Sequence, residues 1–351
     1  MNSYRVVGLM SGTSLDGVDI ACCVFEQRRE KWSFRIEKTE TIPYTNQQRR
    51  NLVNLSQASA MQFAMEHVAY GKYLGGLVKD FLKRNRLKVD FISSHGHTIF
   101  HQPAAHFTTQ IGDGAALSVA CGLPVVCDFR SVDVALGGQG APLVPVGDKL
   151  LFGQYDACLN LGGIANISFD SSGKRVAFDI CPVNIVMNHL AALKGKRFDK
   201  DGMMAKKGNV QGKLLKKLNA LSFYKRAIPK SLGREDIEKY FLKIIDGDRS
   251  SVEDKLRTFC EHIAIQVAEA TRNIRGKMLV TGGGAYNLFL VDRINSHCRP
   301  ETVIPGKQII EFKEALIFAF LGVLRWRNEI NCLRSVTGAS RDSSGGAIYH
   351  P

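Results

Sequence analysis

The sequence contains no long uninterrupted run of apolar residues. Hydrophobic residues make up 45% of the 351 residues, yet no run reaches the roughly 18–20 residues that a membrane-spanning helix needs. The apolar run at residues 6–10 is also too short for the core of a signal peptide, and no cleavage site of small residues follows it. We therefore expect a cytoplasmic protein with no membrane partner.

Pairs of the form Cys-x-x-Cys are also absent, although the chain has nine cysteines. Their number is odd and their spacing is scattered, which argues against a disulfide framework. Several cysteines lie in apolar segments, where a thiol behaves as a small hydrophobic group. We expect the cysteines to be reduced and mostly structural.

Acidic residues are too few to balance the basic ones, and the formal net charge is +14. Such a charge is compatible with nucleic-acid binding or with attraction of small anions. The lysines and arginines, however, are spread in small groups without the interleaved aromatic residues of a nucleic-acid module. We expect no nucleic-acid partner, and a solvated basic surface that helps to attract ATP and an acidic substrate.

Two segments have the pattern of a β-hairpin, in which two apolar runs flank a short turn. The first hairpin has a polar turn at residues 11–17, and the second spans residues 156–169 with Gly162 and Gly163 at its turn. The two segments share a plan but not a detailed sequence. This similarity predicts two halves that are built alike.

The length of the chain exceeds that of a typical single compact domain, which predicts two lobes. We place the boundary in an irregular, glycine-rich stretch, so that residues 1–135 and residues 136–351 form the two lobes. Helical periodicity at residues 47–84, short apolar strands and a nearly all-apolar helix at residues 313–325 predict an α/β fold. The last helix is expected to be buried.

The two turns have the composition of a phosphate clamp. Glycine leaves backbone N–H groups open to an approaching anion. The first turn adds hydroxyl donors and carboxylates that could hold Mg²⁺, namely Ser11, Thr13, Ser14, Asp16 and Asp19. A single such turn is more often an ordinary hairpin, but two of them, with glycines at residues 282–284 before a helix, favour nucleotide binding. The P-loop and Gly-x-Gly-x-x-Gly patterns do not occur.

A set of segments, spread from one end of the chain to the other, matches one family in order. They are residues 8–19, 94–98, 110–113, 128–133, 135–145, 159–168, 230–235, 282–287, 314–316 and 335–340. On these segments the chain resembles the anhydro-N-acetylmuramic acid kinases. The resemblance implies a two-lobed α/β fold of the actin/Hsp70/sugar-kinase (ribonuclease H-like) class, with a cleft between the lobes.

The resemblance also implies a reaction. ATP phosphorylates O6 of 1,6-anhydro-N-acetylmuramic acid while water opens the anhydro bridge at C1, which gives N-acetylmuramic acid 6-phosphate and ADP in peptidoglycan recycling. ATP and Mg²⁺ are the implied cofactors, and a homodimer is the implied assembly. Asp179 is the implied base, although its residue type and place alone are more typical of a helix N-cap.

The turns and the resemblance together predict the ligand-binding residues. The predicted ATP-binding residues are Gly12, Thr13, Ser14, Leu15, Asp16, Gly17, Val18, Asp19, Gly162, Gly163, Gly282, Gly283 and Gly284, with Asp16 as the Mg²⁺ ligand. The predicted substrate-binding residues are His97, Thr98, Arg130, Asp133 and Asn184. The planar fork of Arg130 suits a substrate carboxylate, or else forms a salt bridge. Asp133 either orients Arg130 or binds a sugar hydroxyl.

One segment departs from the family pattern. The family usually reads Asp-Thr-Gly-Pro-Gly-Asn, whereas residues 179–184 read Asp-Ile-Cys-Pro-Val-Asn. If the missing glycines allow close approach of a ligand, Cys181 and Val183 crowd that approach. This leaves two alternative hypotheses, a relative that binds nucleotide or sugar as a sensor and a kinase for a different sugar. His97 also stands where the family commonly has Gln.

Overall fold

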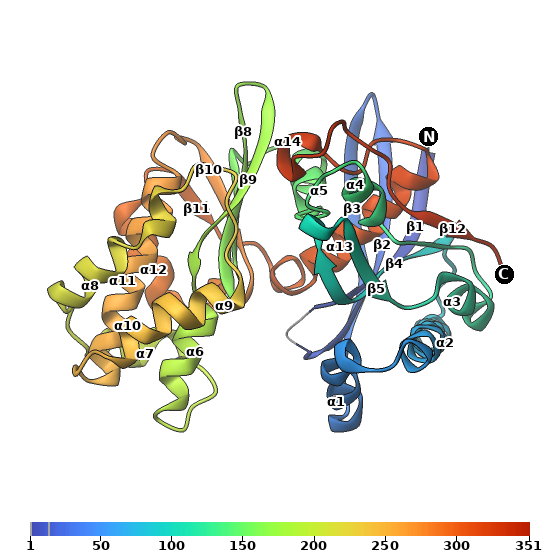
Figure 1. Cartoon of the computed structure of the whole chain (residues 1–351). Coiled ribbons are helices and arrows are strands. Elements are labelled where there is room, and N and C mark those ends of the chain that lie inside the picture. Colours follow the sequence, from blue (N-terminus) through green and yellow to red (C-terminus); the bar gives the residue numbers. More distant parts are fainter. Residues whose placement is uncertain (1, 13–14) are drawn as a thin grey trace. The chain divides into compact units, whose positions relative to one another are not determined.

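The structure is a computed structural model of the chain and describes residues 2–12 and 15–351. Two predicted ATP-binding residues, Thr13 and Ser14, lie outside the described residues. The chain forms two compact units (Figure 1). Unit 1 contains the residues up to Leu151 together with Phe312–Pro351, and unit 2 contains Phe152–Glu311.

Unit 1 is built on a mixed sheet with the strand order β12-β6-β4-β1-β2-β3, and β5 pairs with β4. The strands β1, β2 and β3 form an antiparallel meander, while β4 is parallel to β1 and β6 is parallel to β4. Their bounds are Asn2–Ser11 (β1), Gly17–Arg28 (β2), Lys31–Pro43 (β3), Phe91–Gln102 (β4), Phe107–Ile111 (β5), Val125–Cys127 (β6) and Ala347–Tyr349 (β12). The predicted first hairpin is therefore confirmed.

Helices cover both faces of this sheet because alternate residues of β1 point to opposite sides. Val7 and Leu9 pack in a core with helix α2. On the other face, a Cβ at Gly8 would lie 2.0 Å from the Ala315 carbonyl oxygen of α13, so only glycine permits this approach. The helices are α1 (Asn46–Asn54), α2 (Ala60–Asn85), α3 (Gly114–Cys121), α4 (Ser131–Ala135), α5 (Val144–Leu151), α13 (Lys307–Trp326) and α14 (Arg334–Thr337).

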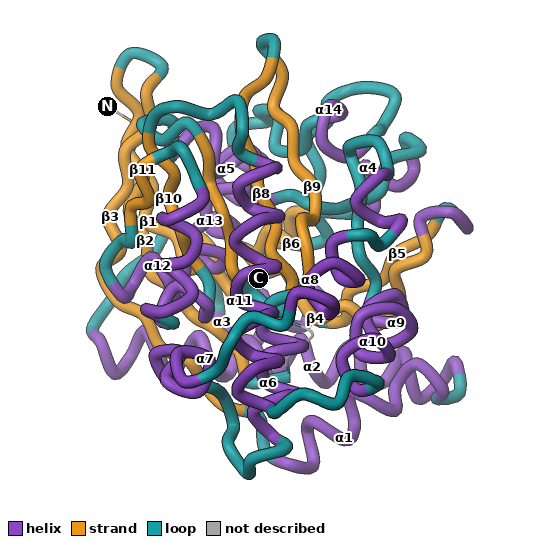
Figure 2. The backbone as a smooth tube through the Cα atoms, turned by 90° about the vertical axis from the view of Figure 1, so that its left-hand side faces the viewer, coloured by secondary structure: helices purple, strands orange, loops and turns teal. Residues whose placement is uncertain are grey.

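Unit 2 repeats the plan of unit 1 with the strand order β11-β10-β7-β8-β9. Again the first three strands form an antiparallel meander, and two parallel strands follow on the side of the first. The bounds are Ala157–Leu161 (β7), Ile164–Ser171 (β8), Lys174–Pro182 (β9), Lys277–Thr281 (β10) and Glu301–Val303 (β11). The hairpin of β8 and β9 extends beyond the helices of its unit (Figures 1 and 2).

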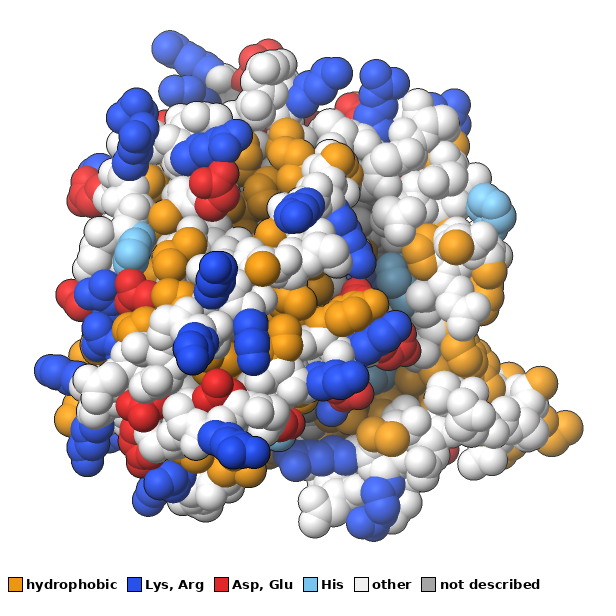
Figure 3. All heavy atoms as spheres, turned by 60° about the vertical axis from the view of Figure 1, so that its left-hand side comes forward, with side chains coloured by type: hydrophobic (Ala, Val, Ile, Leu, Met, Phe, Trp, Pro, Cys, Tyr) orange, Lys and Arg blue, Asp and Glu red, His pale blue; other side chains and the backbone are white. Residues whose placement is uncertain are grey.

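The helices of unit 2 pack around α11, whose buried residues include Phe259, Ile263 and Val267. They are α6 (Asn184–Ala192), α7 (Met203–Lys207), α8 (Gly212–Asn219), α9 (Arg234–Asp236), α10 (Lys243–Asp246), α11 (Val252–Ala270) and α12 (Leu288–His297). Lys and Arg side chains are spread over the face of this unit that comes forward in Figure 3, with apolar and acidic side chains among them. Within the described residues, no helix has the length and apolar character needed to cross a membrane.

The repeated sheet plan confirms the predicted α/β fold with two similar halves. The division of the chain, however, differs from the predicted ranges 1–135 and 136–351, because it falls after Leu151 and again after Glu311. Two C-terminal elements return to unit 1 and account for the difference. Strand β12 pairs with β6, and the buried residues of α13 pack on the first sheet, where the Phe25 and Phe320 rings lie 5.3 Å apart.

Candidate functional site

The glycine turn of unit 2 connects β7 to β8 and is held in place by hydrogen bonds to its backbone. Its two carbonyl oxygens accept hydrogen bonds from the start of α6, Gly163 from the Val183 N–H at 2.8 Å and Gly162 from the Asn184 N–H at 3.3 Å. A planar trans peptide holds a carbonyl and the following N–H in opposite directions. The Gly163 N–H therefore points away from α6, as a donor to an anion must.

The glycines at residues 282–284 lie beside this turn. Gly282 has a φ of +81°, and a Cβ there would lie 2.4 Å from the Asn160 Oδ1, so this position requires glycine. A Cβ at Gly284 would lie 2.7 Å from the Leu161 Cβ, at the end of β7. The two predicted glycine sites of unit 2 thus meet at one edge of its sheet.

Asn184 joins the same edge. Its side-chain amide donates to the Leu161 carbonyl at 3.1 Å, and a Cβ at Gly283 would lie 3.6 Å from that amide nitrogen. Asn184 was predicted from the sequence to bind the substrate. In this structure it lies beside the glycines of unit 2, where its amide supports the end of β7.

Asp179 lies within β9, so the interpretation of this residue as a helix N-cap is wrong. Helix α6 begins only at Asn184, with Val183 at the cap position. The register of β8 and β9 is interrupted between Asp179 and Cys181, and such a bulge changes the direction of nearby side chains. Both the N–H and the carboxylate of Asp179 bind one segment, the N–H donating to the Lys230 carbonyl at 2.9 Å.

The carboxylate of Asp179 accepts a hydrogen bond from the Leu232 N–H at 2.9 Å, through Oδ2. Burial raises the pKa of Asp179 to about 6, while the Leu232 hydrogen bond opposes this rise. The group is therefore largely ionised at neutral pH, yet basic enough to take up a proton. These are the properties that a general base needs.

The first predicted phosphate turn lies in unit 1 and is fastened by side chains. At the end of β1, the Ser11 hydroxyl lies 2.8 Å from His97 Nδ1 and 2.6 Å from the Tyr44 hydroxyl. The Tyr44 hydroxyl in turn bonds to that of Tyr70. Burial lowers the pKa of His97 to about 4, so its ring is neutral at pH 7. His97, which is predicted to bind substrate, also anchors the first residue of the turn.

The other predicted residues of this turn differ in exposure. Asp16 is exposed, and its carbonyl accepts from the Tyr44 N–H at 3.3 Å. Asp19 accepts from the Thr41 hydroxyl at 2.6 Å. Val18 is fully buried, so only its backbone is available to a nucleotide, and the partly buried Leu15 packs against the same core. Gly12 closes the turn by accepting from the Leu15 N–H at 3.2 Å.

Arg130 forms a partly buried link between two loops of unit 1. Its guanidinium lies 2.9 and 3.1 Å from His95 Nε2 and donates to the Gly140 carbonyl at 2.6 Å. Burial lowers the pKa of Arg130 to about 10, so it stays charged at neutral pH. Beside His95 and Gly96 lies a polar cavity of about 230 Å³, whose wall includes Gln110.

Asp133 has a different role from the one expected. Its carboxylate is 1% exposed and accepts from the Gly140 N–H at 2.7 Å, the Thr337 hydroxyl at 2.7 Å and the Cys332 thiol at 3.0 Å. These contacts join the glycine-rich loop to the C-terminal segment. Thr98 is tied to the Gln110 amide at 3.4 Å.

Glu314 is a residue that the sequence reasoning passed over. Glu314 is solvent-exposed, yet the protein atoms packed around its carboxyl group raise its pKa, as does Asp19, whereas Lys313 and Arg130 lower it. The carboxyl group therefore lies within electrostatic reach of two predicted site residues. The signal was present, because residues 314–316 belong to the matching segments.

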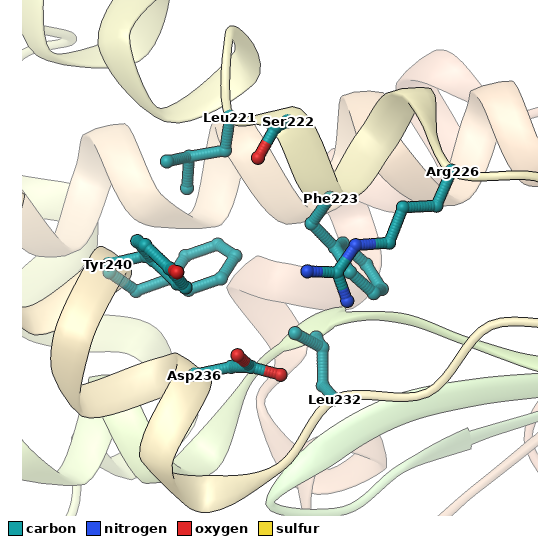
Figure 4. Close-up of a pocket in the computed structure, with 8 residues that line it drawn as sticks. Leu221, Ser222, Phe223, Arg226, Leu232, Asp236 and Tyr240 are labelled. Carbon is teal, nitrogen blue, oxygen red and sulfur yellow. The ribbon is translucent and has the colours of Figure 1, made fainter.

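A small cavity of unit 2 is not the site. It measures about 10 Å³, enough for a single water, and is lined by Leu221, Ser222, Phe223, Arg226, Leu232, Asp236, Tyr240 and Phe241. The side chains of Arg226, Leu232 and Asp236 point into it (Figure 4).

The chain is similar in sequence to one family of known proteins. The family model described as anhydro-N-acetylmuramic acid kinase matches residues 4–351. The chain belongs to the anhydro-N-acetylmuramic acid kinase family. A kinase of this name from Sulfurovum sp. (strain NBC37-1) is 33% identical and covers 99% of this chain and 100% of its own. One from Vibrio cholerae is 35% identical and covers 98% of each chain.

Among solved structures, the activator of the 2-hydroxyisocaproyl-CoA dehydratase from Clostridium difficile with bound ADPNP aligns over 92% of this chain and 97% of its own. Its TM-score is 0.45 at 12% identity, and this similarity is too low to support a conclusion about the present chain. Membership of the anhydro-N-acetylmuramic acid kinase family and the repeated sheet plan agree with the predicted actin/Hsp70/sugar-kinase fold class.

The departure from the family pattern after Asp179 does not crowd a ligand. Cys181 and Val183 are fully buried, and Ile180 is 3% exposed. All three pack in the core of unit 2 with Val186 and Ile263. The expectation of crowding is wrong, because these three side chains lie in the core of unit 2, whereas Asp179 beside them remains partly exposed. The reason for suspecting an altered member of the anhydro-N-acetylmuramic acid kinase family is thereby removed.

Proposed function

We propose that this chain is an ATP-dependent kinase that converts 1,6-anhydro-N-acetylmuramic acid to N-acetylmuramic acid 6-phosphate. The observation that carries the proposal is the Asp179 carboxylate, which is fixed at one oxygen and has a pKa of about 6. A kinase that only transfers a phosphoryl group needs no base to activate water. Hydrolytic opening of an anhydro ring requires such a base. Family membership supplies the substrate class.

In the proposed reaction, Asp179 takes a proton from water as the water oxygen attacks C1 of the sugar. The C1–O6 bond breaks, and its electron pair passes to O6. This oxygen then forms a bond to the γ-phosphorus of ATP, and ADP leaves. Phosphoryl transfer depends mainly on positioning and on neutralisation of charge, so the chain's other residues act by binding and orienting.

The glycines of both turns are proposed to hold ATP. The Gly163 N–H supplies a backbone donor, and the close approach of Gly282 and Gly284 to the end of β7 leaves room beside the backbone. Mg²⁺ usually keeps several waters and takes only one or two carboxylates. The exposed Asp16, with Asp19 beside it in sequence, fits this demand. The ion would neutralise the charge that develops on the phosphates.

Arg130 is proposed to bind the carboxylate of the sugar acid. Its charge is retained in a partly buried position, where a charge-assisted contact is strong. The cavity beside its partner His95 offers further polar groups for the sugar. Cytoplasmic peptidoglycan recycling and a homodimeric assembly are proposed on the family resemblance alone.

A coupled assay of ADP release tests the proposal. ADP should form only when ATP, Mg²⁺ and 1,6-anhydro-N-acetylmuramic acid are all present, and glucose should not replace the sugar acid. ADP release at the same rate without the sugar would contradict kinase function. Release with another sugar only would show that the substrate is wrong.

A further inference from the structure

The segment at residues 230–235 matches the family, but the proposed reaction assigns it no role. It runs along the free edge of β9, the last strand of its sheet. Two hydrogen bonds join it to a single residue of that strand, from the Asp179 N–H to the Lys230 carbonyl and from the Leu232 N–H to the Asp179 Oδ2, both of 2.9 Å.

The segment is itself held firmly on both sides of this contact. The Lys230 ammonium lies 4.6 Å from the centre of the Phe223 ring and donates to the Phe223 carbonyl at 3.4 Å. The Leu232 side chain is 6% exposed and belongs to the core of unit 2. The N–H of Leu232 is therefore a fixed donor.

We propose that the Leu232 N–H is a positioning group for the Asp179 carboxylate, which holds Oδ2, leaves Oδ1 to the attacking water and favours the ionised form. This inference rests on the proposed function of Asp179 as a base. Within the described residues, Oδ1 has no hydrogen-bond partner, so it is the oxygen available for proton transfer. A hydrogen bond that is stronger with a carboxylate than with a carboxylic acid stabilises the charged form.

The titratable groups around Asp179 and Cys181 include a thiol, a phenol and an ammonium group. Burial raises the pKa of the Cys181 thiol and of the Tyr224 hydroxyl, so both stay neutral. Burial and Arg226 lower the pKa of Lys230, but its ammonium lies over the Phe223 ring rather than at the carboxylate. The burial of Asp179 raises its pKa, and the Leu232 N–H opposes that rise.

The decisive variant of the test removes one N–H and leaves the side chain in place. Incorporation of the α-hydroxy analogue of leucine at position 232 converts the amide to an ester and removes the donor. Leu232→Pro also removes it, and Leu232→Ala is the matched control that keeps the N–H but loses packing. The measurement is the dependence of kcat on pH with 1,6-anhydro-N-acetylmuramic acid.

Wild type should lose turnover as the pH falls through about 6, the pKa of Asp179. In the ester and proline variants this acid limb should move up by about one pH unit, so that relative turnover at pH 6.5 falls about threefold. Leu232→Ala should keep the wild-type limb and lose only thermal stability. The ester variant decides the matter if the proline variant does not fold.

The result that would overturn the inference is an unchanged acid limb in the ester variant while Asp179→Asn is inactive. An acid limb displaced equally in Leu232→Ala would also overturn it, because packing would then be the cause. Full turnover of Asp179→Asn would instead remove the base itself, and with it the proposed mechanism. The two failures are therefore distinguishable.

Discussion

The two glycine turns occupy equivalent places in the two units but are fastened in different ways. In unit 1, a chain of buried side chains from Tyr70 through Tyr44 and Ser11 to His97 holds the start of the turn. In unit 2, the carbonyls of Gly162 and Gly163 bind the backbone of α6. Because side chains are changed by single mutations and backbone groups are not, the first turn should be the more sensitive to substitution of its anchors.

The largest effect is expected at Asp179, the proposed base on the sheet of unit 2. Asp179→Asn should lower turnover by a factor of ~10² or more, since this is the low end of a general-base contribution, while ATP affinity stays unchanged. The measurement is steady-state turnover beside ATP titration. Turnover within a few-fold of wild type would refute the assignment.

The same variant should also be more stable at pH 7. The folded-state pKa of Asp179 is raised to about 6, so folding favours the protonated form. This contribution to stability is present below the unfolded pKa and is lost as the pH rises through about 6. Removal of the charge should therefore add about 3 kcal/mol to the free energy of unfolding at pH 7 and nothing at pH 3.

Unit 1 supplies the proposed binding group for the sugar acid. Arg130→Lys retains the charge but cannot contact His95 and Gly140 through a planar fork, so the KM for the sugar acid should rise by about 10-fold to 100-fold, on the order of 1.5–3 kcal/mol. The control is Arg234→Lys, because the Arg234 side chain is 82% exposed. An unchanged KM in the Arg130 variant would reject its role.

The backbone fastening of unit 2 can be tested with two alanine substitutions. Gly282→Ala places a Cβ 2.4 Å from Asn160 Oδ1 at a positive φ and should cost about 1–3 kcal/mol of stability together with ATP affinity. At Gly162 the nearest atom would lie at 3.3 Å, so Gly162→Ala should stay folded and weaken ATP binding only. Thermal unfolding and ATP titration separate the two effects. Equal stability of both variants would contradict the packing described.

The side-chain fastening of unit 1 can be tested at His97. His97→Leu leaves the buried Ser11 hydroxyl without this partner and should cost about 1–3 kcal/mol, with weaker ATP binding. His97→Gln, the residue common in the family, can still bond to Ser11 and should behave almost as wild type. Urea unfolding provides the comparison. Equal losses in both variants would show that the ring, not the hydrogen bond, matters.

The local features of the fold could be predicted from the sequence, and the long-range ones could not. Apolar runs around short turns indicate both hairpins because strand and turn signals are local. The pairing of β12 with β6 joins residues more than 200 positions apart, and a strand of three residues leaves no pattern to detect. The lobe boundary was misplaced for the same reason.

The site residues also divide into those with a local sequence signal and those without one. The glycines at residues 162–163 and 282–284 could be found because close backbone approach demands this residue type. The N–H of Leu232 could not, because every residue except proline has such a group. Asp179 was predicted as the base only through the family resemblance, because its residue type and place alone suggest an N-cap and the bulge that keeps it within β9 has no distinct sequence signal.

The central claim is that water opens the anhydro ring while phosphate passes to O6, and one isotope measurement tests it. The reaction is run in H₂¹⁸O with ATP and 1,6-anhydro-N-acetylmuramic acid, quenched rapidly and analysed by mass spectrometry. The account predicts one ¹⁸O in the sugar phosphate, ADP in equal amount and no ¹⁸O in inorganic phosphate beyond the background of a sample without sugar. Label in inorganic phosphate, with no labelled sugar phosphate, would mean that the protein hydrolyses ATP and would contradict the account.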